Sequence, residues 1–434
     1  MDREILKLAI PNIIANITIP LLGMIDLALM GRLGNEDFIG AVALGTMIFN
    51  FIYWVFSFLR MGTSGFTAQA YGTGNMAEAI TILSRSLFVG LLGAGFLMIF
   101  QVPIAMLSFS LIQGSAEVES LAGEYFSIRI WAAPATISLY SLTGWFIGMQ
   151  NARSPMFISI AINIFNIVLN LLFVFRWNML SNGVALGTVV AQYLGLLIAV
   201  WILLKKYFRL LPYWNFKKAL NRAALRMFVM VNKDILIRTL CVLSVLTFFT
   251  AKSASTDDTI LAVNSILLQF LLFFSFFVDG FAYAAEALTG KYIGAAKPAL
   301  LKQSTRRLFI WGAVVALLFS GTYLFGSDLI LNLMTTDKEI IDLAMVFVPW
   351  LVFLPLVALP AFIWDGIFIG ATASVSMRNT MLVATVVFFL IFFLLRHQLN
   401  NHALWLGLIL FMLTRGAGLT ILYKKHVFSR LGYY

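Results

Sequence analysis

The chain of 434 residues is 61% hydrophobic and 11% charged, and its mean hydropathy is +0.94. Soluble domains carry about twice that share of charged residues, so the composition excludes an ordinary soluble protein and indicates a polytopic helical membrane protein. The apolar runs are too long for transmembrane barrel strands, which alternate over about ten residues. The net charge of +11 would suit nucleic acid, but Lys and Arg gather in connections on one side of the predicted membrane, so we expect no such partner.

Cysteine and histidine usage limits the chemistry that is available. The single cysteine, Cys241, forms no intrachain disulfide, and the three histidines lie near the ends of apolar runs, where they assemble no zinc or haem site. The N-terminus enters a full-length apolar run without a small-residue cleavage site, so we do not interpret it as a cleaved signal. We expect no enzymatic activity, no cofactor and no metal site.

Twelve apolar runs of spanning length predict the architecture. Those of the first half cover residues 5–33, 39–70, 79–110, 119–148, 155–176 and 183–208. Those of the second half cover residues 222–252, 259–290, 302–326, 340–370, 377–396 and 402–424. We predict an all-α fold with two pseudo-symmetric six-helix lobes, residues 1–208 and 222–434, joined by a cytoplasmic amphipathic linker at 209–221.

An even number of spans places both termini on one side of the membrane. With the termini inside, twenty Lys and Arg fall on the inner side and five on the outer side. The positive-inside rule therefore predicts a multi-pass protein with both termini in the cytoplasm.

The two halves resemble each other at an offset near half the chain length, as expected for parallel repeats with a substrate site between them. The alternative is a duplicated scaffold without transport. The matches are Ala41-Val42 after Asp37 with Ala262-Val263 after Asp258, AQAYG at 68–72 with AEALTG at 285–290, and 146–148 with 368–370.

One carboxylate, Asp26, lies inside the first apolar run, after Pro11 and Pro20. A carboxylate at membrane depth is costly and normally faces a polar cavity or a partner, while prolines weaken a spanning helix and offer a bending point. These features predict a proton-coupling acid on a helix that bends. The alternative is a structural Asp that only binds a neighbouring helix.

The fifth run has a polar stripe. Ser159, Asn163, Asn166 and Asn170 follow at steps of four, three and four, which places them on one helix face. Lipid offers no hydrogen bonds, so this face meets protein or water. Either it lines a cavity or its amides clamp two helices together.

The second half holds further buried polar candidates for a cavity. Asn264, Asp279 and Glu286 fall on one face of the eighth run, within about 60° on a helical wheel. Glu286 also lies near the cytoplasmic end, where it could simply be hydrated. Asp365 lies in the proline-broken tenth run. Bases within or near apolar runs, among them Arg238, are expected to pair with some of these acids, but the sequence does not assign the pairs.

The chain resembles the multidrug and toxic compound extrusion (MATE) transporters, particularly the DinF-like branch, over nearly its whole length. The segments that carry the resemblance are IPN with GMIDLALMGRLG, GWFIGMQNARSPM, NIFNIVLNLLFVF, ILAVNSILLQ, FFVDGFAYAAEALTG and WDGIFIGATASVSMRNTM. The resemblance implies two lobes around a central cleft that opens alternately to each side. It also implies export of amphipathic, often cationic compounds against H⁺ or Na⁺.

The resemblance further implies that Asp26 takes the coupling proton, that the first helix bends at Pro11, and that Asn166 and Thr188 belong to the surrounding polar network. Many relatives carry a second aspartate where this chain has Asn170. An amide there removes one charge from an anionic cage and disfavours tight Na⁺ binding.

These observations together predict a monomeric, lipid-embedded antiporter that exports amphipathic, cationic drugs or metabolites in exchange for protons. The alternatives are a Na⁺-coupled exporter of the same fold and a flippase for lipid-linked saccharides or polysaccharides.

Overall fold

The structure is a computed structural model of the chain, and it describes residues 1–31, 36–111 and 115–431. Side chains at 19, 21, 22, 24, 26–31, 36, 111, 430 and 431 also lie outside this description. Every element in the described ranges is a helix, which confirms the predicted all-α fold. Ten of the described helical segments are long and apolar enough to cross a membrane.

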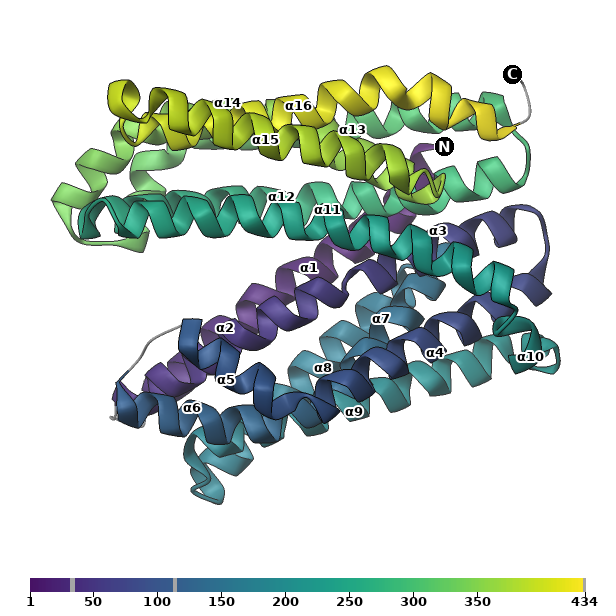
Figure 1. The fold of residues 1–434 in the computed structure, drawn as a ribbon, viewed down its shortest axis with the longest axis horizontal. Helices are drawn as coiled ribbons and strands as arrows, with labels where there is room; N and C mark the ends of the chain where they lie inside the picture. Colours follow the sequence, from purple (N-terminus) through teal and green to yellow (C-terminus); the bar gives the residue numbers. More distant parts are fainter. Residues whose placement is uncertain (32–35, 112–114, 432–434) are drawn as a thin grey trace. The chain divides into compact units, whose positions relative to one another are not determined.

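The six predicted spans of the first half each coincide with one helix or with helices in direct succession (Figure 1). They are α1 (Asp2–Gly31), α2 (Glu36–Phe56) with α3 (Phe58–Gly72), α4 (Met76–Ile99) with α5 (Gln101–Leu111), α6 (Ala116–Arg129) with η1 (Ile130–Ala132) and α7 (Ala133–Gly148), α8 (Arg153–Leu171) with the π-helical turn η2 (Leu172–Arg176), and α9 (Leu180–Tyr207). Neither α6, with 14 residues, nor α7, with 16, crosses a bilayer alone, since a spanning helix needs about 20 residues.

The predicted amphipathic linker is also helical, and six long helices follow it. The linker holds η3 (Phe208–Tyr213) and α10 (Phe216–Ala219). The second half consists of α11 (Arg222–Ala254), α12 (Asp258–Gly294), α13 (Pro298–Met334), α14 (Lys338–Gly370), α15 (Ser374–Leu399), α16 (His402–His426) and the short η4 (Phe428–Leu431).

The chain divides into two compact units. One contains residues 14–71 and 75–228, and the other contains residues 1–13, 72–74 and 229–434. This division differs from the predicted lobes. Residues 222–228 at the start of α11 belong with the first half of the chain, and residues 72–74 together with Met1–Ile13 of α1 belong with the second half. The close approach of Met1–Ile13 to α12 explains its assignment: a Cβ on Gly280 would lie 2.3 Å from Ile13 Cγ1 and 2.9 Å from the Ala9 carbonyl oxygen.

The backbone repeats between the two halves at an offset of 222 residues. Left-handed residues recur in pairs, Gly74 with Ala296, Gln150 with Thr372, and Asn178 with Asn400. Close helix crossings recur as well. A Cβ on Gly144 would lie 2.3 Å from the Arg60 carbonyl oxygen, and a Cβ on Gly366 would lie 2.2 Å from that of Ala282.

The duplication seen in the sequence is therefore also present in the structure, and the structural offset distinguishes a correct sequence match from a wrong one. The pairing of 146–148 with 368–370 has the structural offset. The pairing of AQAYG with AEALTG is wrong. Gly148 packs on Thr67 as Gly370 packs on Thr289, so these two threonines correspond. Thr67 directly precedes AQAYG, whereas Thr289 lies inside AEALTG.

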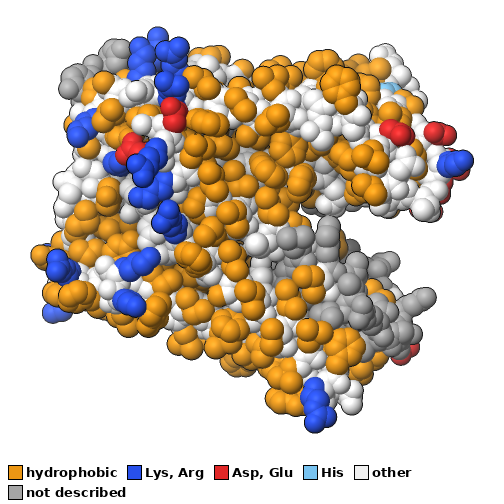
Figure 2. All heavy atoms as spheres, turned by 180° about the vertical axis from the view of Figure 1, so that it is seen from behind, with side chains coloured by type: hydrophobic (Ala, Val, Ile, Leu, Met, Phe, Trp, Pro, Cys, Tyr) orange, Lys and Arg blue, Asp and Glu red, His pale blue; other side chains and the backbone are white. Residues whose placement is uncertain are grey.

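The outer faces of both units are apolar. Ile99 of the first unit and Phe325 and Leu333 of the second are 76%, 87% and 79% exposed. Figure 2 shows hydrophobic side chains over most of one face, with Lys and Arg gathered toward one end. Long helices with such surfaces suit a hydrocarbon environment, in which backbone polar groups are satisfied within each helix.

Candidate functional site

A chain of directed hydrogen bonds joins α8 to α9. Asn170 Nδ2 donates to Asn166 Oδ1 at 2.9 Å, and Asn166 Nδ2 donates to Thr188 Oγ1 at 2.8 Å. Thr188 Oγ1 in turn donates to the Val184 carbonyl at 2.9 Å. Both amides are 0% exposed. We call Asn166, Asn170 and Thr188 the amide cluster; the structure brings together these three predicted residues, and their role in transport stays a prediction.

The amide cluster depends on a glycine in α9. A Cβ on Gly187 would lie only 2.2 Å from Asn170 Oδ1, far inside van der Waals contact. Only a residue without a side chain therefore allows the Asn170 amide to lie against α9 while it donates to Asn166.

The neighbouring turns of α8 contact α1. Asn163 Nδ2 donates to the Thr18 carbonyl at 3.0 Å, and Thr18 Oγ1 lies 3.4 Å from Ser159 Oγ. The predicted polar stripe of α8 therefore both clamps α1 and carries a buried network. Asp26 lies eight residues beyond Thr18 on α1, and its side chain is outside the described residues.

The N-terminal section of α1 is anchored to α12. Glu4 accepts hydrogen bonds from Lys291 Nζ at 3.0 Å and from the Tyr292 hydroxyl at 2.9 Å. Burial raises the pKa of the Glu4 carboxyl, but these two donors outweigh burial and hold the pKa below its ordinary value of 4.5. Pro11 is buried in this section, Pro20 is half-buried farther along, and the helix is continuous through both. Their predicted role in bending stays a prediction.

The second unit contains a buried ionic cluster, defined by Asp365 on α14, Arg238 on α11 and Arg415 on α16. Asp365 Oδ2 accepts from Arg415 Nη2 at 2.7 Å and also from Arg238 Nη2. The side chains of Asp365 and Arg415 are 6% and 3% exposed. The cluster has one negative and two positive formal charges, so it favours an anionic neighbour over an additional cation.

The other acids predicted in this unit lie on α12. Asp279 is close enough to Arg415 to interact with it electrostatically. Glu286 is 1% exposed. A Cβ on Gly370 would lie 2.3 Å from the Glu286 carbonyl oxygen, so α14 packs directly on this turn of α12. Their predicted roles at a cavity stay predictions.

Asn264 binds three helical segments together at a separate place. Its Nδ2 donates to Ser253 Oγ and to Asn401 Oδ1, both at 2.7 Å. Its Oδ1 accepts from Asn401 Nδ2 at 3.1 Å and from Trp405 Nε1 at 3.0 Å. The Asn264 amide thus forms its hydrogen bonds with α11 and with the start of α16. Fifteen residues of helix, about 22 Å, separate it from Asp279, so the predicted cavity residues do not form one cluster.

Sequence reasoning named Arg238 as a possible partner of an acid but missed Arg415. The signal was present, because Arg415 is a lone base inside an apolar run and a buried base needs a counter-charge. Among the described residues, no group of three His, Cys, Asp or Glu could hold a metal ion.

The fold and its buried polar clusters define the class of this chain: a polytopic helical membrane protein built from two homologous halves. The sequence profile of the MatE family matches residues 11–172 and again residues 235–395. The chain therefore belongs to the MatE family of membrane transporters, and the resemblance noted in the sequence is confirmed.

Curated relatives agree with this assignment. The chain is 36% identical to the DNA damage-inducible protein F of Escherichia coli (strain K12) over 426 residues, covering 98% of this chain and 92% of that protein. It is 27% identical to the probable multidrug resistance protein NorM of a Synechocystis species over 350 residues, covering 76% and 74% of the two chains.

Solved structures share the fold. A MOP superfamily transporter from Pyrococcus furiosus superposes with a TM-score of 0.87 at 16% identity, over 99% of this chain and 96% of that one. A MATE transporter in the straight conformation gives a TM-score of 0.88 at 18% identity, over 98% and 96%.

Proposed function

We propose that the chain is a secondary antiporter that exports amphipathic, cationic compounds in exchange for protons, with Asp26 as the coupling acid. Membership of a multidrug and toxin extrusion family supports transport. One observation supports protons over Na⁺: every buried polar side chain that the structure describes in the unit of residues 14–71 and 75–228 is neutral or basic. Asn170 is one of these neutral groups. These described side chains therefore add no second carboxylate that would strengthen a Na⁺ site, whereas a proton needs only the single acceptor that Asp26 supplies.

In this mechanism the ionised Asp26 attracts a lipophilic cation from the cytoplasmic side. A proton from outside then removes the charge, alters the hydrogen bonds of the amide cluster and favours bending of α1, so that the substrate leaves. Protonation shifts the two states only by the difference in its free energy between them. A hundredfold shift in population therefore requires a difference of about 2.8 kcal/mol.

The contacts of α8 with α1 support a connection between this acid and the amide cluster. Asn163 donates a hydrogen bond to the Thr18 carbonyl, and the amide cluster begins one helical turn farther along α8 at Asn166. A change in the position of α1 beyond Thr18 is thereby transmitted to the face of α8 that carries the cluster. We further propose a monomer in a bacterial inner membrane with both termini in the cytoplasm.

The test is export of a fluorescent cation from proteoliposomes under an imposed pH gradient or an imposed Na⁺ gradient. We expect the pH gradient alone to drive export and Asp26→Asn to abolish it while the protein remains folded. Glu117→Gln, which changes an exposed acid in the first turn of α6, serves as the matched control. Normal pH-driven export by Asp26→Asn would reject the coupling role. Export driven only by Na⁺, or movement of a lipid-linked saccharide but of no cation, would favour the alternatives.

A further inference from the structure

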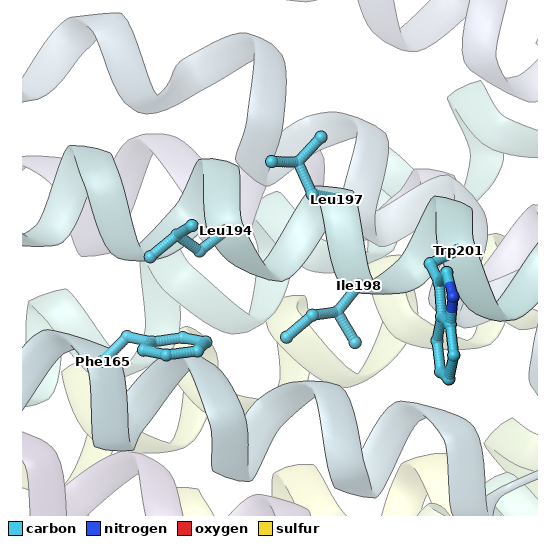
Figure 3. A pocket seen from close by; sticks show the side chains of 5 residues that line it. All are labelled: Phe165, Leu194, Leu197, Ile198 and Trp201. Carbon is cyan, nitrogen blue, oxygen red and sulfur yellow. The ribbon is translucent and has the colours of Figure 1, made fainter.

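The outer surface of α8 and α9 contains an apolar pocket of about 270 Å³, which is unrelated to the amide cluster. Phe165 of α8 lies opposite side chains from α9 (Figure 3). The residues from α9 are Leu194, Leu197, Ile198 and Trp201. They occupy positions i, i+3, i+4 and i+7 and therefore form one stripe of the helix. Leu197 and Trp201 are 64% and 58% exposed, so the stripe is open to the surroundings.

The same stripe ends on a positive charge. Lys205 follows Trp201 by four residues, and its Nζ lies 4.7 Å from the centre of the Trp201 ring. Lys206 Nζ lies 3.5 Å from Ser154 Oγ at the start of α8. Arg153, the first residue of α8, is therefore near the same end of the helix pair. The apolar stripe thus ends beside Lys205, and two further bases, Arg153 and Lys206, lie at the same end of the two helices.

No acid of the surrounding sequence compensates these bases. From Tyr125 to Lys233 the chain contains no Asp or Glu, but it contains eleven Lys and Arg. The last acid before this stretch, Glu124, accepts from Asn182 near the start of α9, at the opposite end from Lys205. The basic end of the pocket is therefore complementary to an anion.

We propose that this pocket is a binding site for one anionic glycerophospholipid. An acyl chain lies along Phe165, Leu194 and Ile198, and the phosphate binds Lys205. The indole of Trp201 lies at the junction of the two, because an amphipathic ring favours the boundary between hydrocarbon and headgroups. Basic pockets at the end of spanning helices bind anionic headgroups, and each base near the surface adds about a fivefold preference.

The site can be tested through the fluorescence of Trp201. The purified full-length protein is placed in nanodiscs with brominated phosphatidylglycerol or with brominated phosphatidylcholine of the same chains. The contribution of Trp201 is the difference between the wild type and Trp201→Phe. We expect phosphatidylglycerol to quench it at lower mole fraction than phosphatidylcholine. Lys205→Gln should reduce that preference about fivefold and leave quenching by phosphatidylcholine unchanged.

Lys302→Gln, an exposed lysine at the start of α13, is the matched control and should retain the preference. Equal quenching by the two lipids would overturn the proposal, since it would mean that ordinary bilayer lipid covers this surface. An unchanged preference in Lys205→Gln would overturn it as well. Both variants change exposed side chains, and size-exclusion chromatography verifies that they remain folded.

Discussion

Replacing Gly187 by alanine perturbs the amide cluster without removing any of its polar groups. The added Cβ would lie 2.2 Å from Asn170 Oδ1 and 3.3 Å from Asn170 Cγ. Ordinary contact requires more than 3 Å, so the amide must retreat by about 1 Å. The Asn170–Asn166 hydrogen bond, now 2.9 Å long, would then exceed the length of a real hydrogen bond.

The cost follows from three contributions to the free energy of unfolding. Overpacking of a buried site destabilises by about 1–3 kcal/mol, and the lost hydrogen bond adds about 0.5–1.5 kcal/mol. Alanine favours the helix over glycine by up to about 1 kcal/mol. We therefore expect a net destabilisation of about 0.5–3.5 kcal/mol for Gly187→Ala.

Gly195→Ala provides a matched control on the same helix. Its Cβ would lie 2.3 Å from Ile162 Cγ1, which is a similar overlap, but with a half-buried apolar side chain that is free to rotate. In proteoliposomes under a pH gradient, we expect Gly187→Ala to lose about tenfold in export, corresponding to about 1.4 kcal/mol, while Gly195→Ala stays within twofold. Equal losses in both variants, or none in Gly187→Ala, would refute the role of the amide cluster in coupling.

Two further predictions concern ion pairs in the other unit. Asp365→Asn leaves Arg238 and Arg415 buried without their carboxylate, so it should lower the free energy of unfolding by about 3–5 kcal/mol. Arg415→Met keeps the pair of Asp365 with Arg238 and should cost less. Reversible unfolding in mixed micelles measures both. The opposite order would contradict this assignment. The lowered pKa of Glu4 means that its bond to Lys291 contributes stability above about pH 4.5, which is lost as the pH falls through the lowered value. Glu4→Gln should therefore cost up to about 1 kcal/mol at pH 7, and the difference from wild type should vanish on acidification; a difference independent of pH would disprove the linkage.

The spans and the faces of the helices were predictable because they are local properties. Twenty apolar residues in succession require a helix in lipid, and a helix of 3.6 residues per turn places Asn163, Asn166 and Asn170 on one side regardless of what they meet. The repeated halves could likewise be recognised from short matches, although weak similarity gave one wrong register, AQAYG with AEALTG. The family followed from longer motifs such as WDGIFIGATASVSMRNTM.

The pairings between faces were not predictable from the sequence. Asp365 meets Arg238 and Arg415 across 127 and 50 residues of chain, and Asn264 meets Asn401 across 137. Packing an apolar helix face against one helix rather than another changes the free energy little in a membrane, because lipid is as apolar as the helix surface. Which polar groups meet therefore depends on the close crossings that glycines such as Gly366 allow. The sequence by itself determined the number of helices, the periodicity of their faces and the repeat that relates the two halves. Only the tertiary structure decided which buried charges form ion pairs and which buried amides form hydrogen bonds.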